Sequence, residues 1–519
     1  MSGTSGTAAR LGSLLGMLPL VAVAALAVVV NEPSLAAPPR GQFPIDLQRT
    51  TIAALQEALT NRTITSRELV IAYQERMALF DKAGPRLTAV RMLDPTALAQ
   101  AAQLDEERSR NRVRGPLHGI PVLIKDNVDA AGVPTTAGAI ALRRSLPRDD
   151  AFLVKRLRSA GAIILGKANL TEFANFMTSG MPSGYSGLGG QVRNPYNLGL
   201  SPSGSSSGSA VAAAAALAAV TIGTETSGSI LSPAVANSLV GVKPTVGLIS
   251  RTGILPISAT QDTPGPMARS VSDAAALLTA LTGIDPQDPV TSRSAGVVGT
   301  DYARALSRTA LAGARIGVTP APSGSQGAAF NRAVAVLRAR GATVVPVTVN
   351  TGGLPPSILA YEFKRDLNAY LARLPASAPM KTLDDIVRFN IANADQGTMR
   401  YGQTQLVESN NINLNDPAAR ATYEANRDTG IAAARQRIDS VLRSRSLDAI
   451  LFSGSGSAGI GARAQYPSVA VPIGYDPANG RPFGMSFLGT AFTEARLLAL
   501  AYAYEQASLV WRPPPAVNV

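Results

Sequence analysis

The sequence predicts an α/β protein in which strands and helices alternate around one large core. Short apolar runs bounded by turn residues, such as 119–124 and 162–165, are typical of buried strands. Segments with helical apolar spacing separate these runs, which is the pattern of βαβ units. No linker or internal repeat divides the 519 residues, so we expect a single large domain.

The first half of the chain begins this alternation. Thr65 and Glu68 have the spacing of a capping box, which predicts a helix over 66–82. Asp150 is predicted to cap a helix that runs to residue 160. The other expected elements are helices at 46–60 and 97–109 and strands at 88–93, 119–124 and 162–165.

The second half returns to the same alternation. Residues 241–258 are predicted to form strands and turns beside the Ser/Gly-rich stretch 201–233. Residues 357–444 are mostly helical, more polar and without a strand signal, so we expect a cap or side layer there. The remaining predictions are helices at 270–282, 327–340 and 494–507 and strands at 315–318, 342–347, 448–452, 468–471 and 484–487.

The amino-acid composition excludes several kinds of active site. The chain has no cysteine, which excludes disulfides, thiolate metal sites and a cysteine nucleophile. His118 is its one histidine, so no multi-histidine metal site can form. The net charge of +13 comes from scattered residues rather than a basic run, and we expect no nucleic-acid partner.

The first 36 residues are predicted to be a signal peptide. Arg10 precedes an apolar run over 11–30, and small residues lead to a cleavage position after Ala36. The alternative is a retained membrane anchor, but Gly12, Gly16 and Pro19 interrupt the run. We expect the folded domain to span 37–519 and to be exported to the periplasm or secreted, without membrane contact after cleavage.

The stretch 201–233 is predicted to place serine side chains. It consists of a Gly/Ser loop, a tightly packed Ala-rich helix over 210–220, a short strand and a second Gly/Ser loop. Ser229 is the candidate nucleophile and Ser205 its proton relay. The N–H groups of Thr226, Ser227 and Gly228 could surround a developing oxyanion, although composition alone fits an ordinary turn equally well.

A serine enzyme also needs a base, and Lys125 is the candidate. It ends the apolar strand 119–124, where burial would lower its pKa enough to keep it neutral. Alternatively, its side chain reaches solvent or forms a salt bridge with Asp126. His118 lies before the same strand, roughly 20 Å away at its other end, so both cannot serve one site. We expect His118 to be structural.

Three motifs in this order resemble the amidase signature family. They are IKDN around Lys125, GSSSGS over 204–209 and GTETSGSI over 223–230. The family has a Ser-cisSer-Lys triad whose serines are 24 residues apart, as Ser205 and Ser229 are here. The similarity covers nearly all of the chain after the leader. It implies an amidase domain over 37–519, with a central mixed, twisted β-sheet covered by helices on both sides.

Within that family the sequence is most similar to the peptide amidase branch, in segments such as SGMPSGYSGLGGQVRNPY. Three features depart from the broad family: the common GGSSGGS loop reads SGSSSGS over 203–209, Glu225 replaces an aspartate and Leu231 replaces an arginine. None of them removes a triad member. The missing arginine makes a small acidic substrate a poor fit, since that side chain could pair with a carboxylate.

The resemblance implies hydrolysis of C-terminal peptide amides through an acyl-enzyme on Ser229, without metal or cofactor. Ser179 and Gly180 are expected to border the substrate. Alternatives are a hydrolase of small aliphatic or aryl amides, carbamates or esters, one component of an amidotransferase, and a non-catalytic binding protein. We expect a small-molecule or peptide amide as the partner, and a monomer or homodimer.

Overall fold

The computed structural model describes residues 43–518, of which residues 44–518 belong to one compact unit. The predicted leader, residues 1–36, lies outside the described residues. Within the described range, no helix combines the length and the apolar character that a membrane crossing requires.

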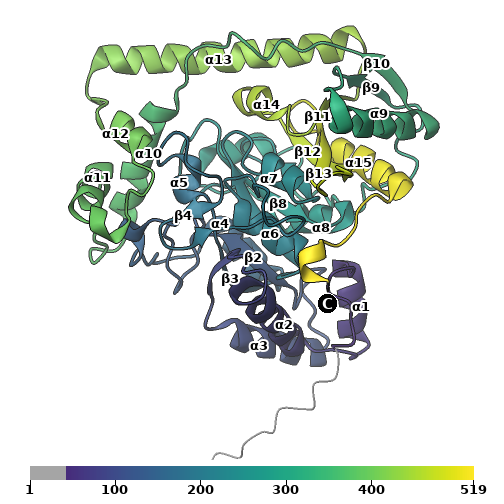
Figure 1. Ribbon diagram of the computed structural model, residues 1–519, viewed down its shortest axis with the longest axis horizontal. Helices are drawn as coiled ribbons and strands as arrows, with labels where there is room; N and C mark the ends of the chain where they lie inside the picture. Colours follow the sequence, from purple (N-terminus) through teal and green to yellow (C-terminus); the bar gives the residue numbers. More distant parts are fainter. Residues whose placement is uncertain (1–42, 519) are drawn as a thin grey trace, which may run out of the picture. The chain divides into compact units, whose positions relative to one another are not determined.

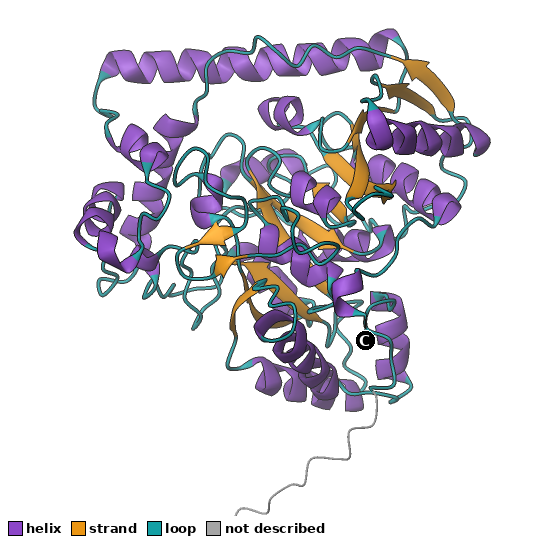
Figure 2. Cartoon of the chain, viewed as in Figure 1, coloured by secondary structure: helices purple, strands orange, loops and turns teal. Residues whose placement is uncertain are grey.

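A mixed eleven-stranded sheet forms the centre of the described chain (Figures 1 and 2). In their order across the sheet, the strands are β1 (Val90–Leu93), β3 (Ile163–Ala168), β2 (Pro121–Lys125), β6 (Val220–Glu225), β8 (Thr263–Ala268), β7 (Val240–Lys243), β12 (Ser468–Tyr475), β13 (Pro482–Leu488), β11 (Ala449–Ser453), β9 (Arg315–Val318) and β10 (Thr343–Pro346). β3, β2 and β6 are parallel, and so are β11, β9 and β10. Antiparallel pairs join these two parallel groups, which confirms the expected mixed α/β sheet.

Helices pack on both faces of this sheet. On one face, α4 (Phe152–Ser159), α8 (Val271–Leu281), α15 (Glu494–Ser508) and α9 (Gly324–Ala339) contact one another in that order. On the other face, α6 (Ser207–Ala214) and α7 (Leu231–Ala236) pack together against the central strands. Every residue of α6 is buried, and its Gly, Ser and Ala side chains let it lie close to the sheet.

Three further helices lie toward the N-terminus. They are α1 (Ile52–Thr60), α2 (Ser66–Arg76) and α3 (Ala97–Ser109). α3 contacts both α2 and β3. The predicted capping box is confirmed, because the Thr65 side chain accepts from the Glu68 N–H while the Glu68 carboxylate accepts from the Thr65 N–H.

A helical layer follows β10. It contains α10 (Leu359–Arg373), α11 (Leu383–Ala392), α12 (Thr404–Asn410) and the long α13 (Pro417–Ser444), which lies at the top of Figure 1. Apolar residues of α10, α11 and α12 share one buried cluster with Phe173, Phe176 and Leu255. Phe363 of α10 packs against both phenylalanines, with ring centroids 6.2 and 4.8 Å apart. The layer therefore covers the loops that follow β3 and β7.

Several local predictions differ from the structure. The Ala-rich helix expected over 210–220 ends at Ala214, and Val220 already belongs to β6. Asp150 does not cap α4, whose N-cap is Ala151, because the Asp150 carboxylate instead accepts from the Ala131 N–H and pairs with Arg158. The strand β8 was not expected. Its sequence, TPGPMA, contains two prolines and a glycine, which disfavour a strand in isolation, and only its position between β6 and β7 makes it one.

The parallel pairing of β2 and β6 brings the candidate residues together. Ile124 of β2 is opposite Ile222 of β6. Since parallel strands end at the same edge of a sheet, Lys125 and Glu225, the last residues of these two strands, lie at one edge.

Candidate active site

Lys125 is a fully buried lysine at the end of β2, with 0% of its surface exposed. Its Nζ lies 2.8 Å from Ser205 Oγ, 2.9 Å from Thr224 Oγ1 and 3.2 Å from the Thr224 carbonyl oxygen. Burial lowers the pKa of Lys125 to about 7, although the nearby negative charges of Asp262 and Glu225 act in the opposite direction. A lysine in this environment can be neutral near pH 7.

The salt bridge considered between Lys125 and Asp126 does not form. The Asp126 carboxylate pairs instead with Arg91, at 2.5 Å from Nε, and with Lys167, at 3.4 Å from Nζ. Because Asp126 follows the strand, its side chain points away from that of Lys125 and satisfies a different buried cation. Lys125 also does not reach solvent, so both alternative interpretations of this residue are wrong.

Ser205 lies in the loop before α6 and is also fully buried. The peptide bond between Gly204 and Ser205 is cis. A Cβ on Gly204 would lie 2.4 Å from Thr171 Oγ1, so only glycine fits at that position. The carbonyl of Ser205 accepts from the Thr171 N–H at 3.0 Å, which fixes the loop against the segment after β3.

Ser229 lies in the turn between β6 and α7 and is 8% exposed. Its carbonyl oxygen accepts from the Ser206 N–H at 3.1 Å, so the two serine loops are directly joined. The Glu225 carboxylate accepts from the N–H groups of Ile230 and Leu231 at 2.8 and 2.9 Å. These two bonds close the turn around Ser229 and hold its ends together.

The N–H groups of this turn are available to a ligand. Within residues 43–518, those of Thr226, Ser227, Gly228 and Ser229 donate to no protein acceptor. Gly228 has φ +86°, a conformation that favours glycine. Unpaired N–H groups in a row can stabilise negative charge on an oxygen atom, as the sequence predicted for three of these residues.

Three polar residues around Lys125 were not singled out from the sequence. Thr224 receives bonds from Lys125 and also from Asn127 Nδ2, at 3.1 Å from its Oγ1. The Asp262 carboxylate accepts from the Thr226 hydroxyl at 2.5 Å, and burial raises the pKa of Asp262 to about 6. Thr224 and Asn127 lie within the recognised motifs and could have been found there. Asp262 carries no local signal, because only the folded chain brings it to this edge.

Ser179 and Gly180, the predicted substrate-side residues, are exposed on the loop after β3. The Ser179 N–H donates to Thr404 Oγ1 of α12 at 3.2 Å. The same loop reaches the catalytic candidates at Ser183, whose Cβ lies 3.5 Å from the position of a Cβ on Gly204. The structure thus places this loop beside Ser205, while Ser179 contacts the helical layer and Gly180 is exposed.

His118 is fully buried before β2, at the opposite end of the strand from Lys125. Its Nε2 lies 2.9 Å from the Leu104 carbonyl, and its Nδ1 accepts from the Arg114 N–H at 3.2 Å. Both ring nitrogens are occupied by backbone groups, so neither is available as a base.

Replacing His118 with alanine is therefore expected to reduce stability and not catalysis. The change leaves the Arg114 N–H without its partner and removes a buried ring, which we expect to lower the free energy of unfolding by about 2 kcal/mol. Urea unfolding measures this loss, and kcat/KM of the folded variant should match that of the wild type. A hundredfold loss of kcat/KM without destabilisation would instead identify His118 as the base.

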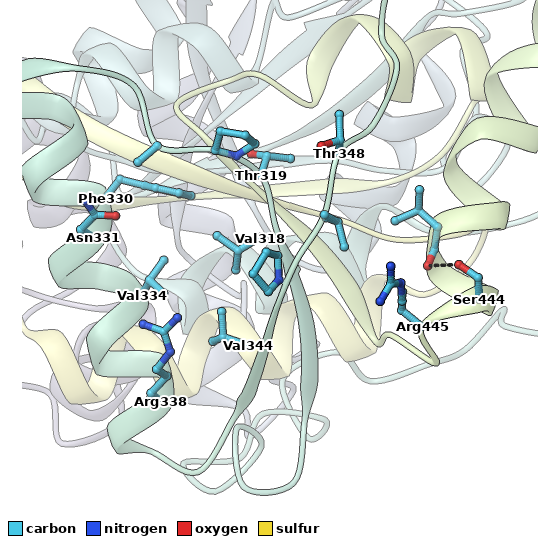
Figure 3. Close-up of a pocket in the computed structure, with 15 residues that line it drawn as sticks. Val318, Thr319, Phe330, Asn331, Val334, Arg338, Val344, Thr348, Ser444 and Arg445 are labelled. Carbon is cyan, nitrogen blue, oxygen red and sulfur yellow. Dashed lines mark hydrogen bonds between the residues drawn. The ribbon is translucent and has the colours of Figure 1, made fainter.

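A cavity of about 650 Å³ lies far from these residues, beside β9 and β10 (Figure 3). Its walls include Phe330, Val334 and Val344, with Arg338 and Arg445 at its margins. β10 is seven strands from β6 in the sheet order, which corresponds to roughly 30 Å. This cavity is therefore not part of the candidate active site.

Comparisons with known proteins agree with the fold. The family model described as Amidase matches residues 68–459. A probable amidase of Arabidopsis thaliana is 39% identical over 482 residues, covering 90% of this chain and 92% of the relative. The chain belongs to the amidase signature family and is an amide hydrolase.

More particular relatives were also found. The solved structure of native peptide amidase from Stenotrophomonas maltophilia is 44% identical, covers 91% of this chain and 99% of that chain, and has a TM-score of 0.85. A glutamyl-tRNA(Gln) amidotransferase component of Halorhodospira halophila is 34% identical over 499 residues, covering 89% of this chain and 98% of the relative. The family thus includes similar proteins with two different reactions.

Proposed function

We propose that this amidase hydrolyses C-terminal amides of peptides and releases ammonia through an acyl-enzyme on Ser229. The observation that carries the proposal is the buried Lys125, bonded to Ser205 Oγ at 2.8 Å with a pKa of about 7. Likeness to peptide amidase along the chain supports the substrate class. Leu231, at the position of the family's usual arginine, removes a partner for a small acidic substrate.

The hydrogen bonds of Lys125 match those of a neutral amine. A neutral amine has two N–H donors and one lone pair. The two oxygens of Thr224, at 2.9 and 3.2 Å, can accept the two donors. The lone pair then faces the Ser205 hydroxyl, and Lys125 is set to take a proton from it.

In the proposed reaction, Ser229 Oγ attacks the amide carbon and forms a tetrahedral intermediate. Its proton passes to Ser205, and the proton of Ser205 passes to Lys125 Nζ. The free N–H groups of the turn over 226–229 stabilise the oxyanion. The carbon–nitrogen bond then breaks, and the proton returns through Ser205 to the leaving ammonia. Water hydrolyses the ester by the same route and restores the free enzyme.

The test is ammonia release from N-acetylated dipeptide amides. The matching peptide acids, which contain the same internal peptide bond but no terminal amide, are the controls. We expect ammonia from the amides and no cleavage of the internal bond. Faster hydrolysis of an anilide or a simple aliphatic amide than of every peptide amide would favour the small-amide alternative. Failure of a serine-directed phosphonate to modify Ser229 would favour a non-catalytic protein.

The pH profile should report the protonation of Lys125. Its pKa is lowered to about 7, so the lysine is neutral above this value and protonated below it. Only the neutral form accepts a proton, so kcat/KM should fall by about tenfold per pH unit below this pKa. Measurement of kcat/KM from about pH 5 to about pH 9 covers the pH range in which this fall is expected. A profile that is flat down to the acid end, or an acid limb near the ordinary lysine value of about 10.4, would contradict the assignment.

A further inference from the structure

A cationic and aromatic cluster lies beside the candidate catalytic loops. The rings of Tyr185 and Tyr401 meet edge to face, with centroids 4.9 Å apart. The guanidinium carbon of Arg400 is 5.6 Å from the centroid of Tyr185 and 5.8 Å from that of Tyr401. Both distances are within the range of cation–π attraction, so the two rings hold the arginine in place.

The cluster is connected to the loop of the candidate relay serine. Tyr185 begins the short strand β4 (Tyr185–Ser186), and Ser183 beside it packs near Gly204. The Gly184 N–H donates to Thr171 Oγ1 at 2.8 Å. Thr171 is the residue whose own N–H holds the carbonyl of Ser205. Hydrogen bonds through Gly184 and Thr171 therefore connect the aromatic cluster to the catalytic loop.

The turn that carries Arg400 is fixed on both sides. The hydroxyls of Thr178 and Thr404 lie 2.9 Å apart and join this turn to the loop after β3. The buried Thr398 hydroxyl donates to carbonyl oxygens at the end of α11, at 2.7 and 3.0 Å. These bonds fix the backbone from which the Arg400 side chain extends, so the fold sets its position beside Tyr185.

The charge of Arg400 is not neutralised by the protein. Within residues 43–518, its guanidinium forms no ion pair within 4.0 Å and no hydrogen bond, and its side chain is exposed. Within the same residues, the ring contacts leave the N–H donors of the guanidinium without an oxygen acceptor. Those donors match the two oxygens of a carboxylate.

We propose that Arg400, framed by Tyr185 and Tyr401, is a subsite for a carboxylate side chain in the acyl part of the substrate. The amidase would then prefer peptide amides with Asp or Glu one or two residues before the amidated residue. Two extended residues span about 7 Å, so a side chain at either of these positions can lie that far along the peptide from the scissile amide. This subsite rests on the proposed peptide amidase function.

The experiment compares three N-acetylated peptide amides that differ at one position, occupied by Glu, Gln or Lys. An exposed ion pair contributes up to about 1 kcal/mol, so wild-type kcat/KM should be about threefold to fivefold higher for Glu than for Gln, and lower again for Lys. Added salt should reduce the difference. Arg400→Gln should abolish the advantage of Glu over Gln, and Arg400→Glu should invert the order of Glu and Lys.

Arg340→Glu is the matched control, because it makes the same charge change on an exposed residue after α9. It should keep the preference for Glu. Equal wild-type kcat/KM for the Glu and Gln peptides, or a preference for Glu that survives in Arg400→Glu, would overturn the subsite alone. Absence of hydrolysis of all three peptide amides by the wild type would overturn the proposed function and the subsite together.

Discussion

Replacing Ser229 with alanine is expected to abolish acyl-enzyme formation and to reduce kcat by about 10⁴-fold or more. The hydroxyl is the only group in the proposed mechanism that forms a covalent bond to the substrate. The turn itself should survive, because Glu225 holds it through the N–H groups of Ile230 and Leu231 and not through the serine side chain. The free energy of unfolding should therefore change little.

Steady-state ammonia release and phosphonate labelling measure this effect. Ser440→Ala is a suitable control, since Ser440 is exposed on α13 and its hydroxyl donates to the Arg437 carbonyl of the same helix. The control should retain wild-type kcat and labelling. If Ser229→Ala still accumulated a covalent acyl-enzyme, the nucleophile would have to be another residue.

Replacing Lys125 with methionine is expected to reduce kcat by about 10³-fold or more, because general base catalysis is lost from both acylation and deacylation. Methionine keeps most of the side-chain volume and removes the buried amine, so the fold should not be destabilised strongly. Alanine at this position would also leave a cavity, which costs about 2 to 5 kcal/mol of stability. The loss of catalysis could then not be separated from the loss of stability.

Lys167 gives the matched control, since it is also a fully buried lysine. Its Nζ donates to Thr135 Oγ1 at 2.9 Å and pairs with Asp126, away from both serines. Lys167→Met should lower the free energy of unfolding by about 3 kcal/mol, because it removes one partner of a buried charge pair. Its kcat per folded molecule should stay near that of the wild type. Guanidinium unfolding together with single-turnover kinetics separates the two outcomes, and the opposite pattern would exchange the roles of the two lysines.

The comparison of these two lysines shows where sequence patterns are sufficient. Lys125 was found because it follows a short apolar run and precedes two serine loops at family spacing. Lys167 also ends an apolar strand, but its role became visible only when the structure placed it against Asp126. Burial of a charge can be inferred from a strand pattern, whereas the partner of that charge depends on which strands are neighbours.

The strands of the fold likewise divide into those that the sequence pattern predicts and those that depend on their neighbours in the sheet. Buried parallel strands such as β2 and β3 begin as continuous apolar runs, and they were predicted within three residues at each end. β8 was missed, because a Pro- and Gly-rich segment becomes a strand here only through pairing with β6 and β7. Gly265 in that strand shows why the segment is unusual, since a Cβ would lie 2.0 Å from the Val242 carbonyl oxygen.

The sequence alone determined the class of the fold and the family, and it predicted Lys125, Ser205 and Ser229 as the candidate catalytic residues, because each of these depends on local pattern and spacing. Tertiary structure decided which groups surround them. Thr224 beside the lysine, Asp262 behind the turn and Arg400 near the loop come from segments far apart in the chain. The physical reason is that hydrogen bonds and charge pairs act over a few ångströms, and only the sheet order and the packing of the helical layer determine which side chains come that close.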